Sequence, residues 1–355
     1  MKFQRKPSTT ATALRKAPVF RAPFGRAHRT RTVAVAVAVA AGIAAVGLAL
    51  ATVPAYAASA PNPAGGKLSW SSGVYLPSAT PASIDAFGTW RGAPVDVVTV
   101  WPDRATWADI VDPSWLYQRW QGSPATVAFG EPMLPQNVAG VSISACAAGS
   151  YNSYWRQFGT NISAYGLGKS IIRLGWEFNG NWYIWQASNP STWVKCWQQI
   201  VTSARTTAPG LQWDWNVNRG RSAGLSDPTL AYPGDAYVDT VGVDSYDSWP
   251  AATTSANWNQ QLNGTQGLMY WFDFAKTHGK KFAVPEWGNM MPGSTAPGKN
   301  AGGDDPAYVN DMLGFFRAHS ANTAWESNFQ GPSTGGVYGA GTRVPKASAA
   351  YQAGF

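Results

Sequence analysis

The most constraining feature of the sequence is the alternation of short apolar runs with amphipathic stretches after residue 67. Eight runs have the length and composition of β-strands: Leu68–Tyr75, Val95–Trp101, Ala125–Phe129, Ser170–Trp176, Leu211–Asn216, Val238–Val243, Lys281–Glu286 and Thr323–Asn328. Helix candidates lie between and after them: Ala82–Trp90, Tyr151–Tyr165, Ser191–Thr207, Asn257–His278, Pro306–His319 and Lys346–Gln352. Most strand candidates are continuously apolar, which is typical of parallel strands covered on both faces.

This order predicts an α/β fold, namely a single-domain (β/α)8 TIM barrel over residues 68–355. An open doubly wound sheet is the alternative. Such a sheet is expected to carry a Gly-rich phosphate-binding loop after an early strand, and neither a GxGxxG nor a P-loop pattern is present. The barrel is therefore the favoured fold, and we expect no cofactor.

The N-terminal segment has the composition of an export signal. Residues 1–32 contain nine basic residues and no acidic one, residues 33–53 form an uncharged apolar run, and Ala55-Tyr-Ala57 is a small-x-small cleavage pattern. We therefore predict a secretory signal peptide over residues 1–57, a Pro/Gly/Ala linker over 58–67, and an extracellular protein. The alternative is an uncleaved membrane anchor, because the apolar run is long enough to span a bilayer.

Removal of this segment changes the charge balance. The whole chain has 27 Lys and Arg against 19 Asp and Glu, and nine of the basic residues lie in the leader. The exported part would then carry 18 basic and 19 acidic residues, which is close to neutral. A near-neutral protein lacks the positive field that nucleic-acid binding requires. We expect no nucleic-acid partner, no membrane contact after signal cleavage, and a monomer.

Two cysteines, Cys146 and Cys196, both lie in the part predicted to be exported. An even number in an oxidising compartment predicts one disulfide, and two buried free thiols are the alternative. The histidines of this part, His278 and His319, are far apart in the sequence and lie in helix-like surroundings. This arrangement does not favour a metal site.

Tryptophan is unusually frequent. All 19 lie after residue 67, and we expect that this is too many for the core alone. Tryptophan outside a core usually forms a flat contact surface, on which sugar rings stack. Charged residues are few, at 13% of the chain, which suits a neutral polar ligand.

Glutamate is scarce, and two of the four follow the clearest apolar strands. Glu177 and Glu286 lie at the ends of the fourth and seventh predicted strands, and each adjoins a tryptophan. In a TIM barrel the C-terminal strand ends form the functional rim, and strands four and seven face each other across it. Two facing carboxylates are the catalytic groups of most glycosidases. When they stand about 5–5.5 Å apart, the enzyme retains the configuration at the anomeric carbon. The remaining two, Glu131 and Glu326, are expected to be paired rim carboxylates.

The pattern around the two glutamates resembles a known family. The sequence Arg173-x-x-x-Glu177-Phe-Asn179-Gly180-x-Trp182-x-x-Trp185, followed by Pro285-Glu286-Trp-Gly288, is similar to the β-mannanases of glycoside hydrolase family 26. The resemblance implies a retaining (β/α)8 enzyme with Glu177 as general acid/base and Glu286 as nucleophile. It also implies that Tyr246 hydrogen-bonds the nucleophile. Arg173 is expected beneath the pocket, where its charge would keep the carboxylates ionised.

Substrate contacts are expected from several further residues. The resemblance implies that Trp182 and Trp325 are sugar-stacking platforms, and Asn179 belongs to the same motif. We expect Trp101 and Trp287 in the pocket wall. Asn216 and Asn218 either bind sugar hydroxyls or fix the loop after the fifth strand. Trp176 stands where the family usually carries a His that positions the nucleophile and the sugar.

The sequence therefore predicts a secreted retaining endo-β-glycoside hydrolase that acts on a polysaccharide. A β-mannan cleaved as by a mannan endo-1,4-β-mannosidase is the first choice. Because of Trp176, β-1,3-xylan and mixed-linkage glucan are also considered. A catalytically silent carbohydrate-binding barrel and a transglycosylase of the cell envelope are the alternative functions.

Overall fold

The computed structural model describes residues 68–293, 296 and 298–355. The predicted signal peptide and linker concern residues 1–67 and lie outside the described residues. Among the described residues, no helix is both long enough and apolar enough to cross a bilayer.

Eight parallel strands form a closed barrel in sequence order, from β1 to β8, with β8 pairing back onto β1. The strands are β1 Ser71–Tyr75, β2 Val97–Val100, β3 Thr126–Glu131, β4 Ile171–Leu174, β5 Gln212–Asn218, β6 Thr240–Tyr246, β7 Lys281–Gly288 and β8 Thr323–Phe329. Each overlaps one predicted strand, so the predicted TIM barrel is confirmed.

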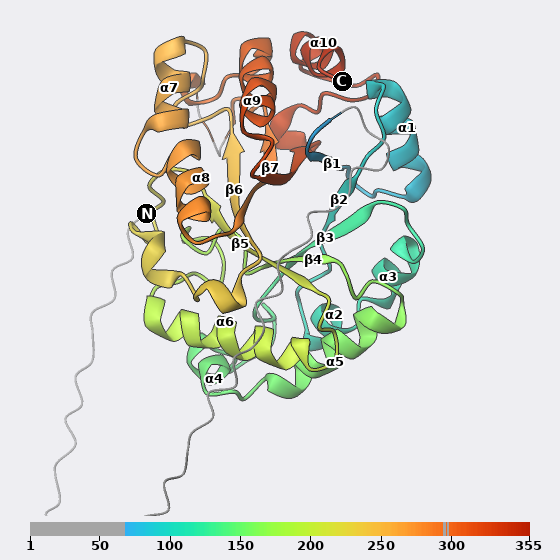
Figure 1. The fold of residues 1–355 in the computed structure, drawn as a ribbon, viewed down its shortest axis with the longest axis vertical. Coiled ribbons are helices and arrows are strands. Elements are labelled where there is room, and N and C mark those ends of the chain that lie inside the picture. The colour runs from blue at the N-terminus through green and yellow to red at the C-terminus, as the bar shows by residue number, and fades with distance from the viewer. Residues whose placement is uncertain (1–67, 294–295, 297) are drawn as a thin grey trace, which may run out of the picture. The chain divides into compact units, whose positions relative to one another are not determined.

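Helices surround the strands (Figure 1). They are α1 Pro81–Arg91, α2 Trp107–Val111, α3 Ser114–Trp120, α4 Ile143–Ala147, α5 Asn152–Ala164, α6 Pro190–Arg205, α7 Ser255–Asn263, α8 Leu268–Thr277, α9 Pro306–His319 and α10 Pro345–Ala353. Short 3-10 turns lie at Pro228–Ala231, Asp235–Tyr237, Gly298–Asn300 and Pro332–Thr334. The short helices α2, α3 and α4 were not among the helices expected from the sequence.

The single helix predicted over Asn257–His278 is wrong, because the structure has α7 and α8 there. The two helices are separated by a turn in which Gln266 has φ +53°. At Gly267 a Cβ atom would lie 2.7 Å from the carbonyl oxygen of Gln261, so this position requires glycine.

The core contains most of the tryptophans. Inside the barrel, Trp325 packs in a layer with small and branched side chains from other strands, including Ala128, Ile171 and Ala283. Between strands and helices lie further fully buried indoles, such as Trp193 and Trp215. Of the 19 tryptophans, 13 are buried. The core therefore holds most of the tryptophans but not all of them, as expected, and six lie outside it.

The predicted disulfide is confirmed: Cys146 of α4 is bonded to Cys196 of α6. The bond joins residues 50 positions apart and lies in a fully buried contact between the two helices.

We expect the double variant Cys146→Ser, Cys196→Ser to be less stable than the wild type by about 4 kcal/mol, because opening this loop raises the entropy of the unfolded chain. Urea unfolding of both proteins measures the difference. Reductant should lower the wild-type midpoint and leave that of the variant unchanged. Equal midpoints for the oxidised wild type and the variant would contradict the expectation.

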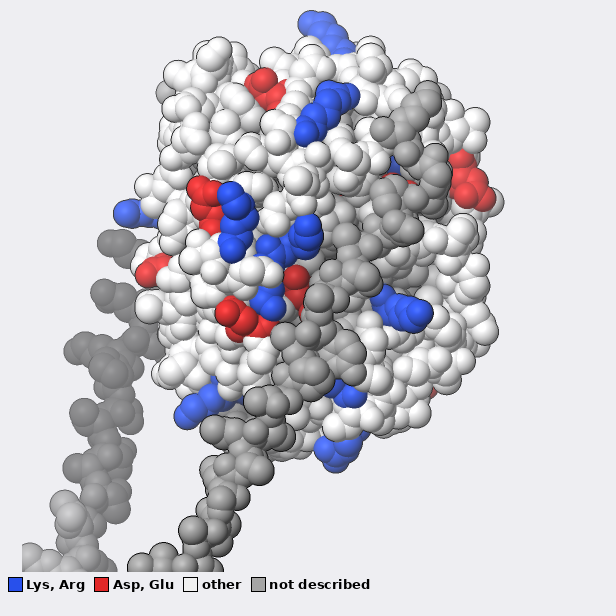
Figure 2. Space-filling view, in the orientation of Figure 1, with Lys and Arg blue, Asp and Glu red and all other residues white. Residues whose placement is uncertain are grey.

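Charged side chains are sparse on the face of the molecule drawn in Figure 2, where Lys and Arg lie interspersed with Asp and Glu. Two ion pairs involve acidic residues that precede β6: His278 Nδ1, just after α8, lies 2.8 Å from Asp235, and Arg205 at the end of α6 lies 3.7 Å from Asp239. Such interspersed charges produce no single-sign field over this face.

Candidate active site

The backbone after β4 places Glu177 at the C-terminal rim. Gly175 and Glu177 both have left-handed backbone conformations, with φ of +54° and +52°. A Cβ atom at Gly175 would lie 2.6 Å from the sulfur of Met133, so glycine is required there. The Glu177 N–H donates to the carbonyl of Asn216 at 3.0 Å, which fixes the turn against β5. Glu177 is thereby held above the strand, partly exposed to solvent.

The carboxylate of Glu177 accepts two hydrogen bonds. Asn218 Nδ2 donates to Oε1 at 2.7 Å, and Trp182 Nε1 donates to Oε2 at 3.1 Å. Burial and the nearby charge of Glu286 raise the pKa of Glu177 to about 7, although the two hydrogen bonds act in the opposite direction. This carboxyl group therefore holds a proton at a higher pH than an ordinary glutamate.

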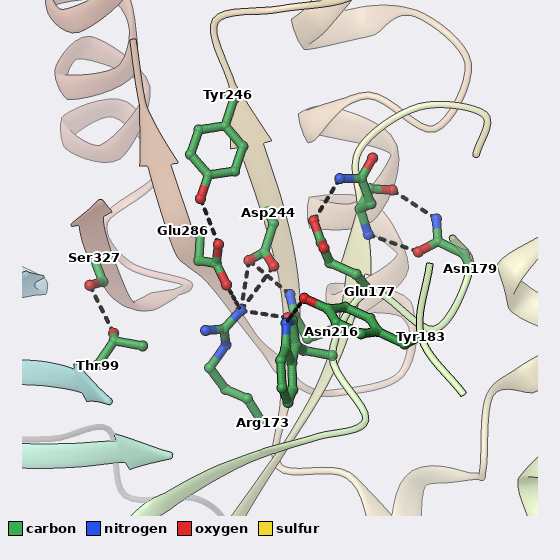
Figure 3. A network of polar contacts seen from close by, with 12 residues as sticks. Thr99, Arg173, Glu177, Asn179, Tyr183, Asn216, Asp244, Tyr246, Glu286 and Ser327 are labelled. Carbon is green, nitrogen blue, oxygen red and sulfur yellow. Dashed lines mark hydrogen bonds and ion pairs between the residues drawn. The ribbon is translucent and has the colours of Figure 1, made fainter. Parts of the chain in front are cut away.

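Glu286 projects from β7 into the same region and is 7% exposed. Arg173 Nη2 donates to its Oε1 at 2.7 Å, and Tyr246 Oη donates to its Oε2 at 2.5 Å (Figure 3). The two donors fix the orientation of the carboxyl group, and Arg173 places a positive charge beside it. Tyr246, at the end of β6, thus makes the contact that the family resemblance implied.

Arg173 is the centre of the network beneath Glu286. It is fully buried, and its Nη2 also donates to Asn216 Oδ1 at 2.7 Å and lies 2.9 Å from Asp244 Oδ2. Burial would lower the pKa of Arg173, but the charges of Asp244 and Glu286 raise it, so the guanidinium stays charged. The Trp101 ring lies 5.4 Å from the guanidinium carbon and completes its surroundings.

A cavity of about 780 Å³ lies above this network and is lined by both Glu177 and Glu286. Asp244, Tyr246 and the 48% exposed Trp182 also line it. The remaining wall comes from residues 218–223 after β5, from Ser248 and Trp249 after β6, and from Met290, Phe329 and Ser333. The structure therefore brings the two predicted catalytic glutamates, Tyr246 and Trp182 into one cleft.

Two predicted sugar contacts lie elsewhere. Trp287 is fully buried against Phe316, on the opposite face of β7 from Glu286, because successive residues of a strand point to opposite sides. Trp325 lies in the barrel interior, four residues before the end of β8 at Phe329. The expectation that these two tryptophans contact the substrate is wrong, and Phe329 provides the aromatic side chain of this strand in the cleft.

Three other predicted contacts have their polar groups engaged inside the protein. Trp176 is 3% exposed, and its Nε1 donates to Tyr183 Oη at 3.0 Å. The side chain of Asn179 is bonded to the backbone N–H and C=O of Asn218, at 2.9 and 2.8 Å. Asn216 donates to Asp244 at 3.1 Å and accepts from Arg173. All three are buried supports of the site. This corrects the predicted substrate contacts of Trp176 and Asn179, and for Asn216 it disfavours the first of the two alternatives, the binding of sugar hydroxyls.

Neither of the other glutamates lies in the cleft. Glu326 points outward from β8 and accepts hydrogen bonds from Ser72 and Trp287. Glu131 is fully buried, and neither carboxylate oxygen has a hydrogen-bond partner among the described residues, so the expectation that it is paired is wrong. Its burial raises the pKa of Glu131 well above the usual value, which favours the neutral acid.

Asn218, at the end of β5, donates a hydrogen bond to Glu177, a contact that the sequence did not predict for it. Two further cleft residues were not in the predicted set. Trp249 and Phe329 follow β6 and end β8, and both line the cleft. Within the described residues, no group of three or more His, Cys, Asp or Glu side chains is placed to hold a metal ion.

The cleft thus contains two carboxyl groups in different environments. Glu286 is bound to a charged arginine and a phenol, whereas Glu177 has a raised pKa and lies next to an exposed indole. A pair of this kind can supply one nucleophilic or charge-stabilising carboxylate and one proton donor.

Comparison with known proteins agrees with this reading. The family model described as glycosyl hydrolase family 26 matches residues 169–282, a region that includes Arg173, Glu177 and Tyr246 and ends before Glu286. The resemblance predicted from the sequence is therefore confirmed.

Two curated relatives match part of the chain. Endoglucanase H of Acetivibrio thermocellus is 30% identical over 121 residues, which is 32% of this chain and 13% of the relative. A mannan endo-1,4-beta-mannosidase of Bifidobacterium adolescentis is 29% identical over 122 residues, which is 33% of this chain and 12% of the relative. The alignments thus cover only a small part of the length of each relative.

Solved structures share the fold at low identity. A modular endo-beta-1,4-mannanase from Cellulomonas fimi has a TM-score of 0.56 and 16% identity, covering 75% of this chain and 65% of that chain. The catalytic domain of a family 26 endo-beta-1,4-mannanase from Bacillus sp. JAMB-750 has a TM-score of 0.56 and 15% identity, covering 80% and 85%. At this identity the likeness shows the barrel fold alone.

Proposed function

We propose that this chain, which resembles glycoside hydrolase family 26, is a retaining endo-β-glycoside hydrolase that cleaves a polysaccharide. The observation that carries the proposal is the pair of carboxyl groups in one cleft, one bound to Arg173 and Tyr246 and the other with a raised pKa. Retaining glycosidases require these two environments, because one group must attack while the other donates a proton.

Glu286 is the proposed nucleophile. Its hydrogen bonds from Arg173 and Tyr246 restrict its orientation, so that one oxygen can attack the anomeric carbon. Bond formation moves negative charge from Glu286 toward the departing oxygen. Arg173 remains paired with Asp244 during this step, so the network does not need to rearrange.

Glu177 is the proposed general acid/base. Its raised pKa lets it deliver a proton to the glycosidic oxygen as the bond breaks. The resulting carboxylate then removes a proton from the water that hydrolyses the glycosyl-enzyme. Asn218 and Trp182 bind the charged form, so they moderate the pKa and orient the group in both steps.

The proposed substrate is a neutral β-linked polysaccharide, with β-mannan as the first choice. The mannosidase name of one curated relative supports mannan, and the endoglucanase name of the other supports testing β-glucan as well. Trp176 stands where the family usually has a histidine, and its indole is bonded to Tyr183, so β-1,3-xylan and mixed-linkage glucan are tested beside mannan. Secretion through a signal peptide over residues 1–57, with a linker to residue 67, is also proposed. The disulfide supports export.

A screen of purified protein on mannans, xylans, β-glucans and arabinans for released reducing ends tests this function. We expect activity on one β-linked polymer, with mannan tried first. Proton NMR of the first products should show the β anomer before mutarotation. Binding without cleavage would favour a silent carbohydrate-binding barrel, and the α anomer as first product would exclude the retaining mechanism.

The pH dependence gives a separate test. Activity should fall as the pH rises through about 7, because Glu177 then loses the proton that it must donate. The hydrogen bond from Asn218 favours the charged form, so Asn218→Ala should raise the pKa of Glu177 and move the alkaline limb of kcat/KM to higher pH. Ser333→Ala, a change in the cleft wall, serves as the control. An alkaline limb that moves to lower pH in Asn218→Ala would argue against Glu177 as the proton donor.

A further inference from the structure

Trp249 is an exposed indole in the cleft wall that none of the assignments above uses. It is 58% exposed and lines the same cavity as Glu177 and Glu286. Three tryptophans of the described residues are strongly exposed, Trp115, Trp182 and Trp249, and two of these three line this cavity. Exposure of so large an apolar surface in a cleft is typical of a ligand-contact surface.

The backbone at Trp249 is strained, with φ +51°. A left-handed conformation is unfavourable for a bulky side chain and persists only where the surroundings impose it. Of the four described non-glycine residues with positive φ, two are Glu177 and Trp249, and both line the cleft.

The loop around Trp249 is firmly anchored even though the indole is exposed. The Trp249 N–H donates to the carbonyl of Asn300 at 3.2 Å, and Ser248 forms a bridge with Ala301. Arg219 Nη2 donates to the carbonyl of Ser248 at 2.8 Å, and Gln261 Nε2 donates to the carbonyl of Pro250 at 2.7 Å. The ring is therefore carried on a fixed backbone, which reduces the entropy lost when a ligand stacks on it.

The position of Trp249 in the barrel indicates which part of a substrate it would meet. Going around the barrel from Glu177 on β4 to Glu286 on β7, the chain passes β5 and β6, and Trp249 follows β6. The loop over residues 218–223 lies on the same arc and is tied to Glu177 through Asn218. Asn218 at the end of β5 holds the carboxyl group of Glu177, the proposed proton donor, on the side of this arc, and we therefore place the sugar beyond the departing oxygen on the same side. The other arc carries Tyr75, stacked on Phe329.

We propose that Trp249 is a stacking platform for a sugar unit on the leaving-group side of the cleft, beyond the unit that contacts Trp182. This inference rests on the proposed function and adds to it a binding site for the departing part of the chain. The proposal requires that the cleft bind at least two sugar units on the leaving-group side. Trp182 would contact the unit next to Glu177, and Trp249 would contact the unit farther from Glu177 along the wall.

The experiment compares two substrates that differ in their leaving group. For mannan these are mannohexaose, whose leaving group is a sugar chain, and dinitrophenyl β-mannobioside, whose leaving group is a small aryl alcohol. If the screen identifies another polymer, its hexasaccharide and dinitrophenyl disaccharide are used. Trp249→Ala should lower kcat/KM on the hexasaccharide by about tenfold, the value of one lost stacking contact, with a much smaller loss on the aryl glycoside. The positions at which the hexasaccharide is cut should also shift.

Trp115→Ala is the matched control, because Trp115 lies on α3, is 46% exposed and is outside the cavity. Trp249→Phe should retain most of the wild-type activity on the hexasaccharide, and thermal unfolding checks that each variant is folded. Two outcomes would overturn the proposed role of Trp249: an equal loss of kcat/KM on both substrates, or an unchanged cutting pattern with no loss of kcat/KM on the hexasaccharide. A wild-type protein that cleaves no polymer in the screen would instead overturn the proposed function.

Discussion

Glu286→Ala is expected to lower kcat on the polysaccharide by roughly 10⁴-fold or more, because loss of a nucleophile removes the covalent step altogether. The change also leaves Arg173 and Tyr246 without their shared partner, although Arg173 keeps its contact with Asp244. Initial rates of reducing-end release measure the loss. Glu326→Gln is the matched control, since Glu326 is also a buried glutamate next to a tryptophan, but it lies outside the cleft.

Azide distinguishes a nucleophile from a merely structural carboxylate. In Glu286→Ala the deleted side chain leaves room beside the anomeric carbon, and azide can attack there. With an activated aryl β-glycoside, azide should restore turnover and give the α-glycosyl azide, because a single displacement inverts configuration. Full activity of Glu286→Ala without azide would contradict the proposed mechanism.

Glu177→Ala is expected to lower kcat/KM on the polysaccharide by about 10²–10⁴-fold, the usual contribution of general acid catalysis. The loss should depend on the leaving group, because a dinitrophenolate departs without a proton. On the aryl glycoside the first step should be nearly retained and the second slowed, so that KM falls and a burst of dinitrophenolate precedes the steady state.

Azide should rescue this variant too, but with the opposite stereochemistry. It replaces water in attacking the glycosyl-enzyme on Glu286, so the product is the β-glycosyl azide. The two azide products together assign both glutamates. An α product from Glu177→Ala and a β product from Glu286→Ala would mean that the roles are reversed.

The strands were predictable because their signal is local. A continuous apolar run followed by polar residues predicts a parallel strand and the position of its end, and this prediction needs no knowledge of tertiary contacts. Lys281–Glu286 is an example. The turn between α7 and α8 was not predictable in this way, because it depends on the close approach of Gly267 to Gln261. The placement of most tryptophans also depends on the volume between the barrel and the helices, which composition does not reveal.

For the site, the sequence identified the strand ends but not the faces of the strands. Glu286 and Trp287 are neighbours, so only one of them can point into the cleft, and the alternation of side chains assigns the other to the core. The same alternation separates Trp325 from Glu326. The supporting contacts of Asn179 and Asn216 depend on distances between strands, which a single sequence does not contain.

The left-handed backbone at Glu177 has a consequence for how this position can vary. Glycine or asparagine would adopt this conformation more readily than glutamate, and either would also remove a partly desolvated acid. Folding and the proposed chemistry therefore make opposite demands on position 177. Selection for stability alone would tend to erase the glutamate, so its persistence in a lineage would record continued use of the reaction.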